Sequence, residues 1–137
     1  MNLLLEIVTP EQKVYKDDIN EVIVPTVKGE IAILPNHINL LTQINPGELI
    51  VKKGTSLQSI AIIGGFLEVN DNKITILADY AVKAQDIEIV RAQEAKKRAE
   101  KIMSEKTSDN ELKIAEAELI KAILELKVAT KHKKRVG

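Results

Sequence analysis

Proline and glycine are confined almost entirely to the first half of this chain. All four prolines and five of the six glycines lie within the first 65 residues, and from Phe66 neither residue recurs before Gly137. Both residues punctuate turns and both are poorly tolerated inside helices. The sequence therefore predicts two domains, a turn-rich one over residues 1–84 and a helical one over residues 85–137. A compact block with a long helical appendage is typical of a part that docks and moves, rather than of a lone enzyme.

The first part has the pattern of short strands separated by turns. Seven apolar or β-branched runs are bounded by turn residues, and they span residues 3–8, 19–24, 30–34, 48–52, 59–63, 66–69 and 74–77. The last two runs flank Asn70–Lys73, where asparagine and aspartate tolerate the left-handed conformation of a hairpin turn. Many short strands at close spacing favour an all-β sandwich or barrel.

The second part has the pattern of two amphipathic helices. The first is predicted from about Ile87 to about Glu105 with Asp86 as its N-cap, and Ser108–Glu111 matches the capping box that opens the second. Apolar residues recur at spacings of three and four, which places each set on one stripe. The stripes are Ala92, Ala95, Ala99 and Ile102, and then Leu112, Ala115, Leu119, Ala122, Leu126 and Ala129. A short polar link between the helices predicts an antiparallel hairpin.

Alanine dominates the predicted contact between these helices. A methyl group buries much less apolar area than a leucine side chain, at ~0.8 kcal/mol per buried CH₂ group. The hairpin is therefore expected to hold together, and to hold its platform, only modestly. Two interpretations follow: alanine serves here only as a strong helix former, or the hairpin is a detachable element.

The composition argues against nucleic-acid binding and against thiol chemistry. Twenty basic and twenty acidic residues give a formal net charge of zero, aromatic residues make up 2% of the chain, and there is no cysteine. Nucleic-acid binders usually carry a basic surplus, and single-strand binders need aromatic faces for stacking. Without cysteine, disulfide frameworks and thiolate metal sites are excluded.

Motifs of catalysis and of membrane insertion are also missing from the sequence. It contains no Gly-x-x-x-x-Gly-Lys-Ser/Thr phosphate loop and no His-Glu-x-x-His zinc motif. The two histidines, His37 and His132, lie in no context that suggests a nucleophile or a metal site. No basic segment precedes the N-terminal apolar run, and no stretch approaches the ~18 apolar residues of a membrane span. We expect a soluble, non-catalytic chain that requires no cofactor and no metal.

Several segments, taken in order, resemble one known family. They are Gly29–His37, Leu40–Thr42, Pro46–Gly47, Gly64–Val69 and Ile74–Asp79, with the alanine-rich helices behind them. Each segment alone is a weak signal, whereas the ordered set is highly specific and extends from about Leu5 to about Ala129. On these residues the chain closely resembles the epsilon subunit of F-type ATP synthases.

The resemblance implies an N-terminal β-sandwich of about ten strands and a C-terminal antiparallel hairpin of two helices. It implies a rotor subunit between the gamma subunit and the c-ring, on the cytoplasmic face of a bacterial plasma membrane or, less in keeping with the sequence, on the stromal side of a thylakoid. Membrane contact would come only through the complex. Members of the family couple proton flow to catalysis and often inhibit ATP hydrolysis, when the hairpin leaves the sandwich and extends along gamma toward the alpha and beta subunits.

The resemblance also assigns a rotor-contact region, which corresponds to a loop over residues 30–42 of this chain. Its candidate contacts with gamma and the c-ring are Glu30, Ile31, His37, Leu40, Leu41 and Thr42. For His37 a second interpretation is a turn residue whose ring bonds to the nearby backbone. Gly64 and Gly65 are most simply explained by a bulge or a close backbone approach.

A nucleotide site is the further implication of the resemblance. Some bacterial relatives bind ATP on the folded hairpin through an Ile-Asp-x-x-Arg-Ala motif, and the matching stretch here is Ile87–Ala92. Glu88 replaces the aspartate, whereas Arg91 and Ala92 match the motif and Arg98 matches a position further along. The candidate ligand is ATP in a regulatory role.

Other positions depart from that nucleotide-binding pattern. Two arginines of those relatives align with Lys121, which keeps the charge but lacks the planar fork suited to phosphate, and with Glu125, which reverses it. Val82 stands where those relatives carry an acid. A helix surface whose charges are simply solvated is therefore the alternative to an ATP site.

The basic tail, residues 131–135, has two interpretations as well. Cations at a helix C-terminus complement its partial negative charge, at ~0.3–1 kcal/mol, or they meet acidic segments of the catalytic beta subunits, as the family suggests.

For the whole chain, the favoured function is a rotor subunit that brakes hydrolysis. The alternatives are an ATP-sensing regulator and a free-standing β-sandwich adaptor that captures an unrelated helix.

Overall fold

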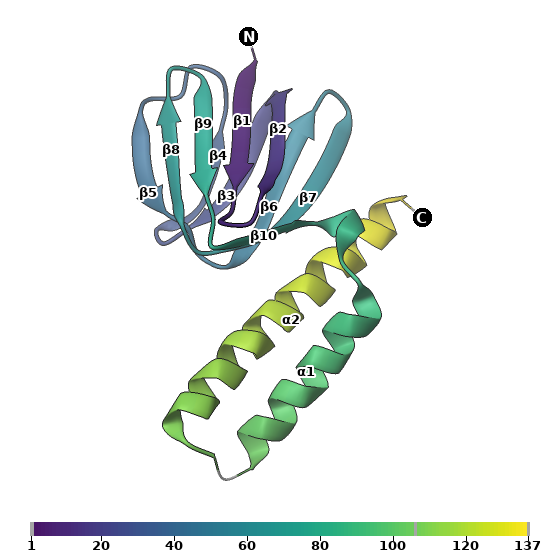
Figure 1. Ribbon diagram of the computed structural model, residues 1–137. Helices are drawn as coiled ribbons and strands as arrows, with labels where there is room; N and C mark the ends of the chain where they lie inside the picture. Colours follow the sequence, from purple (N-terminus) through teal and green to yellow (C-terminus); the bar gives the residue numbers. More distant parts are fainter. Residues whose placement is uncertain (1, 106, 137) are drawn as a thin grey trace. The chain divides into compact units, whose positions relative to one another are not determined.

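The computed structural model describes residues 2–105 and 107–136, with only the backbone of Val136 (Figure 1). Within these residues the chain forms ten strands, a 3₁₀ turn and two α-helices. The strands are β1 (Leu3–Val8), β2 (Lys13–Ile19), β3 (Glu21–Thr26), β4 (Gly29–Ile33), β5 (Leu40–Gln43), β6 (Gly47–Lys53), β7 (Ser56–Ile63), β8 (Phe66–Asn70), β9 (Lys73–Leu77) and β10 (Tyr80–Lys83). The helical elements are η1 (Ala84–Asp86), α1 (Ile89–Ser104) and α2 (Asp109–Val136). The chain divides into two compact units, one ending at Lys83 and the other beginning at Ala84.

Two five-stranded sheets form the first unit. Sheet I has the strand order β2–β1–β9–β8–β5, and sheet II has the order β10–β7–β6–β3–β4. Strand β1 runs parallel to β9, although the two lie far apart in the sequence, and its pairing with β2 is antiparallel. This arrangement confirms the β-sandwich and the number of strands implied by the family resemblance.

The core of the sandwich comes from the alternation of side chains along each strand. In β1, Leu3, Leu5 and Ile7 are fully buried, while the intervening residues are half-buried. Strands β8 and β9 of sheet I and β3 and β6 of sheet II bury residues in the same period of two. Because a β-strand turns successive side chains to opposite faces, one row from each sheet fills the interior.

Charged strands and a strand proline account for the main differences from the predicted strands. Strand β2 was not predicted, because its outward face carries lysine and aspartate; β5 and β10 are only four residues long and were missed as well. The predicted strand over residues 19–24 corresponds to β3 with displaced bounds, because Ile19 is the last residue of β2 and β3 runs from Glu21 to Thr26. Pro25 lies inside β3 rather than after it, at a position where the ladder to β6 has already ended, so no hydrogen bond is lost.

Turn chemistry in the sandwich follows the sequence closely. Asp71 and Asn72 connect β8 to β9 with φ angles of 49° and 61°, which confirms the predicted left-handed hairpin turn. Gly64 and Gly65 also have positive φ angles, and a Cβ atom at residue 65 would lie 1.9 Å from the carbonyl oxygen of Leu77. The prediction of a close backbone approach at this pair is therefore confirmed.

One ion pair joins an edge strand of sheet I to sheet II. Lys53 Nζ of β6 lies 2.6 Å from Asp17 Oδ2 of β2. Both side chains are partly exposed, and the hydrogen bond from Lys53 lowers the pKa of Asp17 while raising that of Lys53. Nearby, the backbone N–H of Gly54 donates to Asn20 Oδ1 at 2.6 Å. These contacts hold the ends of the two sheets together at one corner.

The second unit is a hairpin of two helices that run side by side in opposite directions (Figure 1). Ala92 and Ala99 of α1 and Ala115 and Ala122 of α2 are all buried, as the predicted alanine stripes require. Small side chains let two helix backbones approach closely, with little apolar area between them. The C-terminal end of α2 extends beyond the start of α1 (Figure 1), and α2 contacts η1.

The start of the second helix was predicted better than that of the first. The Glu111 N–H donates to Ser108 Oγ at 3.1 Å, as a capping serine should, while the Glu111 carboxylate accepts from the Thr107 hydroxyl. The predicted N-cap at Asp86 is wrong. Asp86 belongs to the 3₁₀ turn, and α1 begins at Ile89 after Glu88, whose side chain makes no capping bond.

Candidate functional site

The predicted rotor-contact region is made of two strands and the loop between them, not of a single loop. Glu30 lies at the start of β4, beside the β3–β4 turn, and is exposed. The strand carries the chain to Ile33, so His37 and the rest of the loop over residues 34–39 lie at the other end of the sandwich. Strand β5 then returns, so that Gln43 lies beside Val27 near the β3–β4 turn.

The remaining residues of this region divide between the core and the surface. Ile31 and Leu40 are partly buried and pack against the core. Thr42 is half-buried, whereas Leu41 is 70% exposed on the outer face of sheet I. The six predicted contacts therefore do not form one cluster, and Leu41 is the apolar residue among them that is most accessible to a partner.

His37 lies in the loop between β4 and β5, where its ring bonds to the adjacent backbone. The ring Nδ1 atom donates to the carbonyl oxygen of Ile38 at 2.7 Å, and the backbone N–H of His37 donates to the carbonyl oxygen of Leu34 at 3.2 Å. This agrees with the interpretation of His37 as a turn residue. Its neighbour Ile38 is 78% exposed, which makes Ile38 a second accessible apolar side chain of the region.

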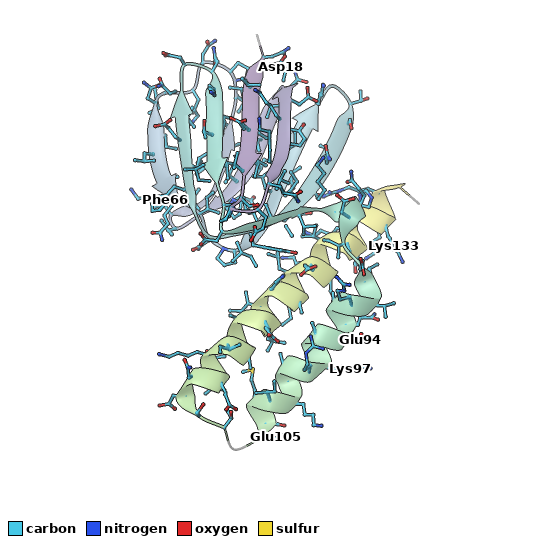
Figure 2. All side chains as sticks on the ribbon, viewed as in Figure 1. Asp18, Phe66, Glu94, Lys97, Glu105 and Lys133 are labelled. Carbon is cyan, nitrogen blue, oxygen red and sulfur yellow. The ribbon has the colours of Figure 1, made fainter. Side chains whose placement is uncertain are left out.

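An apolar surface that sequence reasoning missed lies on the outer face of sheet I. Phe66 and Leu77 are paired across β8 and β9 and are 56% and 58% exposed. They line a hollow of about 450 Å³ together with Val8, Pro10 and Gln43. Phe66 lies at the end of the sandwich where β8 begins (Figure 2). We call Leu41, Phe66 and Leu77 the outer apolar surface.

A signal for this surface was present in the sequence. Strands β8 and β9 carry apolar residues on both faces, since Phe66 is followed by Leu67 and Ile76 by Leu77. A strand with one solvent-exposed face usually alternates apolar and polar side chains. The break in alternation at the Phe66 end of the hairpin was the observation that could have located the surface.

The residues of the predicted nucleotide motif lie at the start of α1. Arg91 Nε lies 3.5 Å from Glu88 Oε2, and both side chains are mostly exposed. Arg98, two turns further along the same helix, is exposed, and so is Lys121 of α2. Ala92 is buried in the seam between the helices. The structure thus pairs the two charged residues of the motif with each other.

The basic tail forms the last turns of α2. Lys133, Lys134 and Arg135 lie in the final turn and are exposed, with Lys133 labelled in Figure 2. Cations at this end complement the partial negative charge of the helix C-terminus. The arrangement fits both interpretations made from the sequence.

Neither a metal cluster nor a membrane-spanning helix occurs in the part of the chain that the structure describes. No group of three or more histidine or acidic side chains is arranged there to hold a metal ion. None of the described helices is both long and apolar enough to cross a bilayer.

Comparison with protein families matches nearly the whole chain. Residues 2–84 match the ATP synthase delta/epsilon chain β-sandwich domain, and residues 85–130 match the long α-helix domain of the same chain. The chain belongs to the ATP synthase delta/epsilon chain family. Members of the epsilon type are non-catalytic subunits of ATP synthase, and so is this chain.

Individual relatives agree with this membership. The ATP synthase epsilon chain of Dehalococcoides mccartyi is 45% identical over 133 residues, covering 96% of this chain and 95% of the relative. The epsilon chain of Herpetosiphon aurantiacus is 43% identical over 136 residues, with 98% and 99% covered. Family membership decides against the free-standing adaptor.

Solved structures share the fold at low sequence identity. A chain in the mitochondrial ATP synthase of Euglena gracilis superposes with a TM-score of 0.67 at 21% identity, over 99% of this chain and 82% of that one. A chain in the central stalk and c-ring of the Tetrahymena thermophila enzyme gives a TM-score of 0.60 at 14% identity, over 94% and 97%. At these identities the two comparisons show a shared fold.

Proposed function

We propose that this chain is the central-stalk subunit that links the gamma subunit to the c-ring of a bacterial F-type ATP synthase and restrains ATP hydrolysis. The proposal rests on the outer apolar surface, because the core of the sandwich is complete without the residues of this surface. Phe66, Leu77 and Leu41 are mostly exposed, yet none is needed to complete the interior. Contiguous apolar patches on a soluble surface mark places where a partner binds.

The sandwich is the part that we expect to dock. Its core cluster lies within residues 3–81, so the sandwich can serve as a rigid platform. We assign the contact with gamma to the outer apolar surface and to the loop over residues 34–39. Of that surface, Leu41 lies next to the loop, whereas Phe66 and Leu77 lie at the other end of sheet I. Glu30, at the β3–β4 turn, lies at the end of the sandwich opposite that loop, which is also the Phe66 end, and is assigned to the c-ring. The complex would place the chain at the cytoplasmic face of the plasma membrane.

The helical hairpin is the part that we expect to move. Its seam is made largely of alanine methyl groups, which bury little apolar area. Extended along gamma, the hairpin would bring the basic tail, residues 131–135, against acidic segments of the beta subunits. Such contacts between exposed charges weaken as salt is added.

Deletion of the hairpin tests this function directly. ATP hydrolysis by the assembled enzyme is measured with the full chain and with residues 1–84 alone. Hydrolysis should rise on deletion while the truncated chain still binds gamma. Unchanged hydrolysis would refute the braking role, and failure of the full chain to form a complex with gamma would refute the rotor assignment itself.

A regulatory ATP site on the hairpin is the second part of the proposal. The observation that favours it is the convergence of Glu88 and Arg91 at the start of α1, with Arg98 two turns away. ATP at 100 times its dissociation constant adds about 2.7 kcal/mol to the state that binds it, enough to shift a conformational equilibrium of a few kcal/mol.

Calorimetry with millimolar ATP tests the nucleotide site. Binding heat from the full chain that disappears in Arg91→Gln, but persists in the matched variant Arg135→Gln, would support it. Absence of heat from the unmodified chain would remove ATP as a ligand and leave the rotor function standing.

A further inference from the structure

Two loops that are distant in the sequence are joined by asparagine side chains. The N–H of Asn36 donates to Asn72 Oδ1 at 2.6 Å, and Asn72 Nδ2 donates to Asn36 Oδ1 at 3.4 Å. A third bond runs from the Asp71 N–H to Asn39 Oδ1 at 3.4 Å. The β8–β9 turn is thereby tied to the loop between β4 and β5, at the end of the sandwich where β8 ends and β5 begins (Figure 1).

The backbone at both sides of this contact is in an unusual conformation. Among the described residues, the non-glycine residues with positive φ angles are Asn36, Asp71 and Asn72, at 68°, 49° and 61°. Asparagine and aspartate tolerate this region better than other residues with side chains. The side-chain bonds therefore connect two backbones that are each held in a left-handed conformation.

The loop over residues 34–39 depends on these bonds because it has little other support. It lies outside the strands, and its remaining bonds involve His37 with the neighbouring carbonyl groups of Leu34 and Ile38. Asn72 itself is anchored, since its carbonyl oxygen accepts from the Leu4 N–H at 2.9 Å. The fixed partner is thus the β8–β9 turn, and the loop is the part that it orders.

We propose that Asn72 is a positioning residue that holds the loop over residues 34–39 in its docking conformation and so presents Ile38 to the gamma subunit. This inference rests on the proposed function. An isoleucine that is 78% exposed gains nothing from burial within the chain, but it can fill a pocket on a partner. Ordering the loop before binding lowers the conformational entropy lost on association.

Hydrogen exchange at the loop amides tests the positioning role with a matched pair of variants. Asn72→Gly keeps the left-handed backbone, which glycine adopts freely, and removes both side-chain bonds. Asp71→Gly also replaces a left-handed residue by glycine, one position away, but it leaves the Asn36–Asn72 bonds intact. The bond of Asp71 to Asn39 is retained as well, because Asp71 donates it from its backbone N–H. Exchange at Asn36 should accelerate about fivefold or more in Asn72→Gly, as expected for losing a hydrogen bond, and less than about twofold in Asp71→Gly.

A conservative variant and a stability measurement separate positioning from a general structural role. Asn72→Asp keeps an acceptor for the Asn36 N–H, and the Asn36 amide can turn to donate to the new carboxylate, so slow exchange should be retained. Thermal unfolding should change little in all three variants. Equal exchange in Asn72→Gly and Asp71→Gly would overturn the proposal, as would acceleration spread evenly over the whole sandwich.

Binding to purified gamma subunit completes the test. Asn72→Gly should weaken binding about fivefold, in step with loss of the ordering bond, and Ile38→Ser should weaken it at least as much. Asp71→Gly and Asn72→Asp should bind as the unmodified chain does. Normal binding by Ile38→Ser or by Asn72→Gly overturns the docking role of the loop. If the unmodified chain does not bind gamma, the proposed function falls, while the exchange data still decide whether Asn72 orders the loop.

Discussion

Gly65 passes so close to Leu77 that a Cβ atom on it would lie 1.9 Å from the Leu77 carbonyl oxygen. The obstacle is backbone of β9, which cannot turn aside as the end of a flexible side chain can. Gly65→Ala should therefore lower the free energy of unfolding by more than about 3 kcal/mol, since it adds a steric clash to the strain of a φ angle of +98°. Denaturant unfolding of the full chain measures this loss.

Gly29→Ala is the matched control for that variant. Gly29 has a similar φ angle of +106°, but no atom lies within 4 Å of an added Cβ. The cost there should be backbone strain alone, about 1–3 kcal/mol. Equal losses at the two positions would show that the close approach to Leu77 contributes nothing.

The alanine seam makes a prediction about overpacking. Ala99 is fully buried between α1 and α2, so Ala99→Leu should destabilise the hairpin by about 1–3 kcal/mol. Ala92→Leu should behave similarly, and Ala95→Leu, at a half-buried position, should cost less. The check is the thermal loss of helical circular dichroism, with Ala117→Leu on the exposed side of α2 as the control. Unchanged melting in Ala99→Leu would contradict the seam.

The serine at the start of α2 offers a test of capping. Ser108 Oγ accepts the Glu111 N–H at 3.1 Å. Ser108→Ala leaves that donor without its side-chain partner and should cost about 1 kcal/mol of helix stability. Ser104→Ala near the end of α1 removes a hydroxyl that bonds the Lys101 carbonyl oxygen but caps no helix start, so it should cost less. A reversed order of the two losses would reject the cap.

The ion pair between the sheets predicts a pH dependence. The hydrogen bond from Lys53 lowers the pKa of Asp17, so its stabilising effect is present above the unfolded-state pKa, about 3.9 for aspartate, and is lost as pH falls through the folded-state value. The pKa of Lys53 is raised, so that group's effect is present below about pH 10 and lost as pH rises further. Asp17→Asn should flatten the decline of stability below about pH 4, measured by urea unfolding against pH.

The outer apolar surface predicts a separation of binding from stability. Phe66→Ser removes a mostly exposed ring, so the free energy of unfolding should change by less than about 1 kcal/mol. Binding to gamma should weaken tenfold or more, as truncation of a central aromatic contact usually does. Leu57→Ser, at a half-exposed leucine on β7 of the other sheet, should leave binding intact. Loss of binding in both variants would point to general damage.

Features that depend on neighbouring residues were predictable from the sequence. The Asp71–Asn72 turn and the Ser108 cap each follow from the chemistry of a few adjacent positions, and both are present. The alanine stripes follow from helical periodicity. Even there, the start of α1 was misplaced, because Asp86 can serve a 3₁₀ turn as well as an N-cap and the sequence does not distinguish them.

Features that depend on tertiary pairing were not predictable. Strand β2 is charged on its outward face and is identified as a strand by its ladder with β1. Leu124 and Val128 are buried although they lie off the predicted stripe of α2. In the candidate site, the bond between Asn36 and Asn72 joins residues far apart in the sequence, and the exposure of Phe66 depends on which face of sheet I turns inward.

The parallel pairing of β1 with β9 has a consequence for synthesis on the ribosome. Leu4 pairs with Lys73 and Val8 with Leu77, so one edge of the first strand to emerge has no neighbour until almost the entire sandwich has been translated. At roughly 5–20 residues per second, that wait lasts about 3–14 seconds. An open apolar edge is a template for association with other chains, and nascent copies on one polysome are close together. The helices, which form from local contacts alone, are translated after β9 and therefore after β1 has gained its second neighbour.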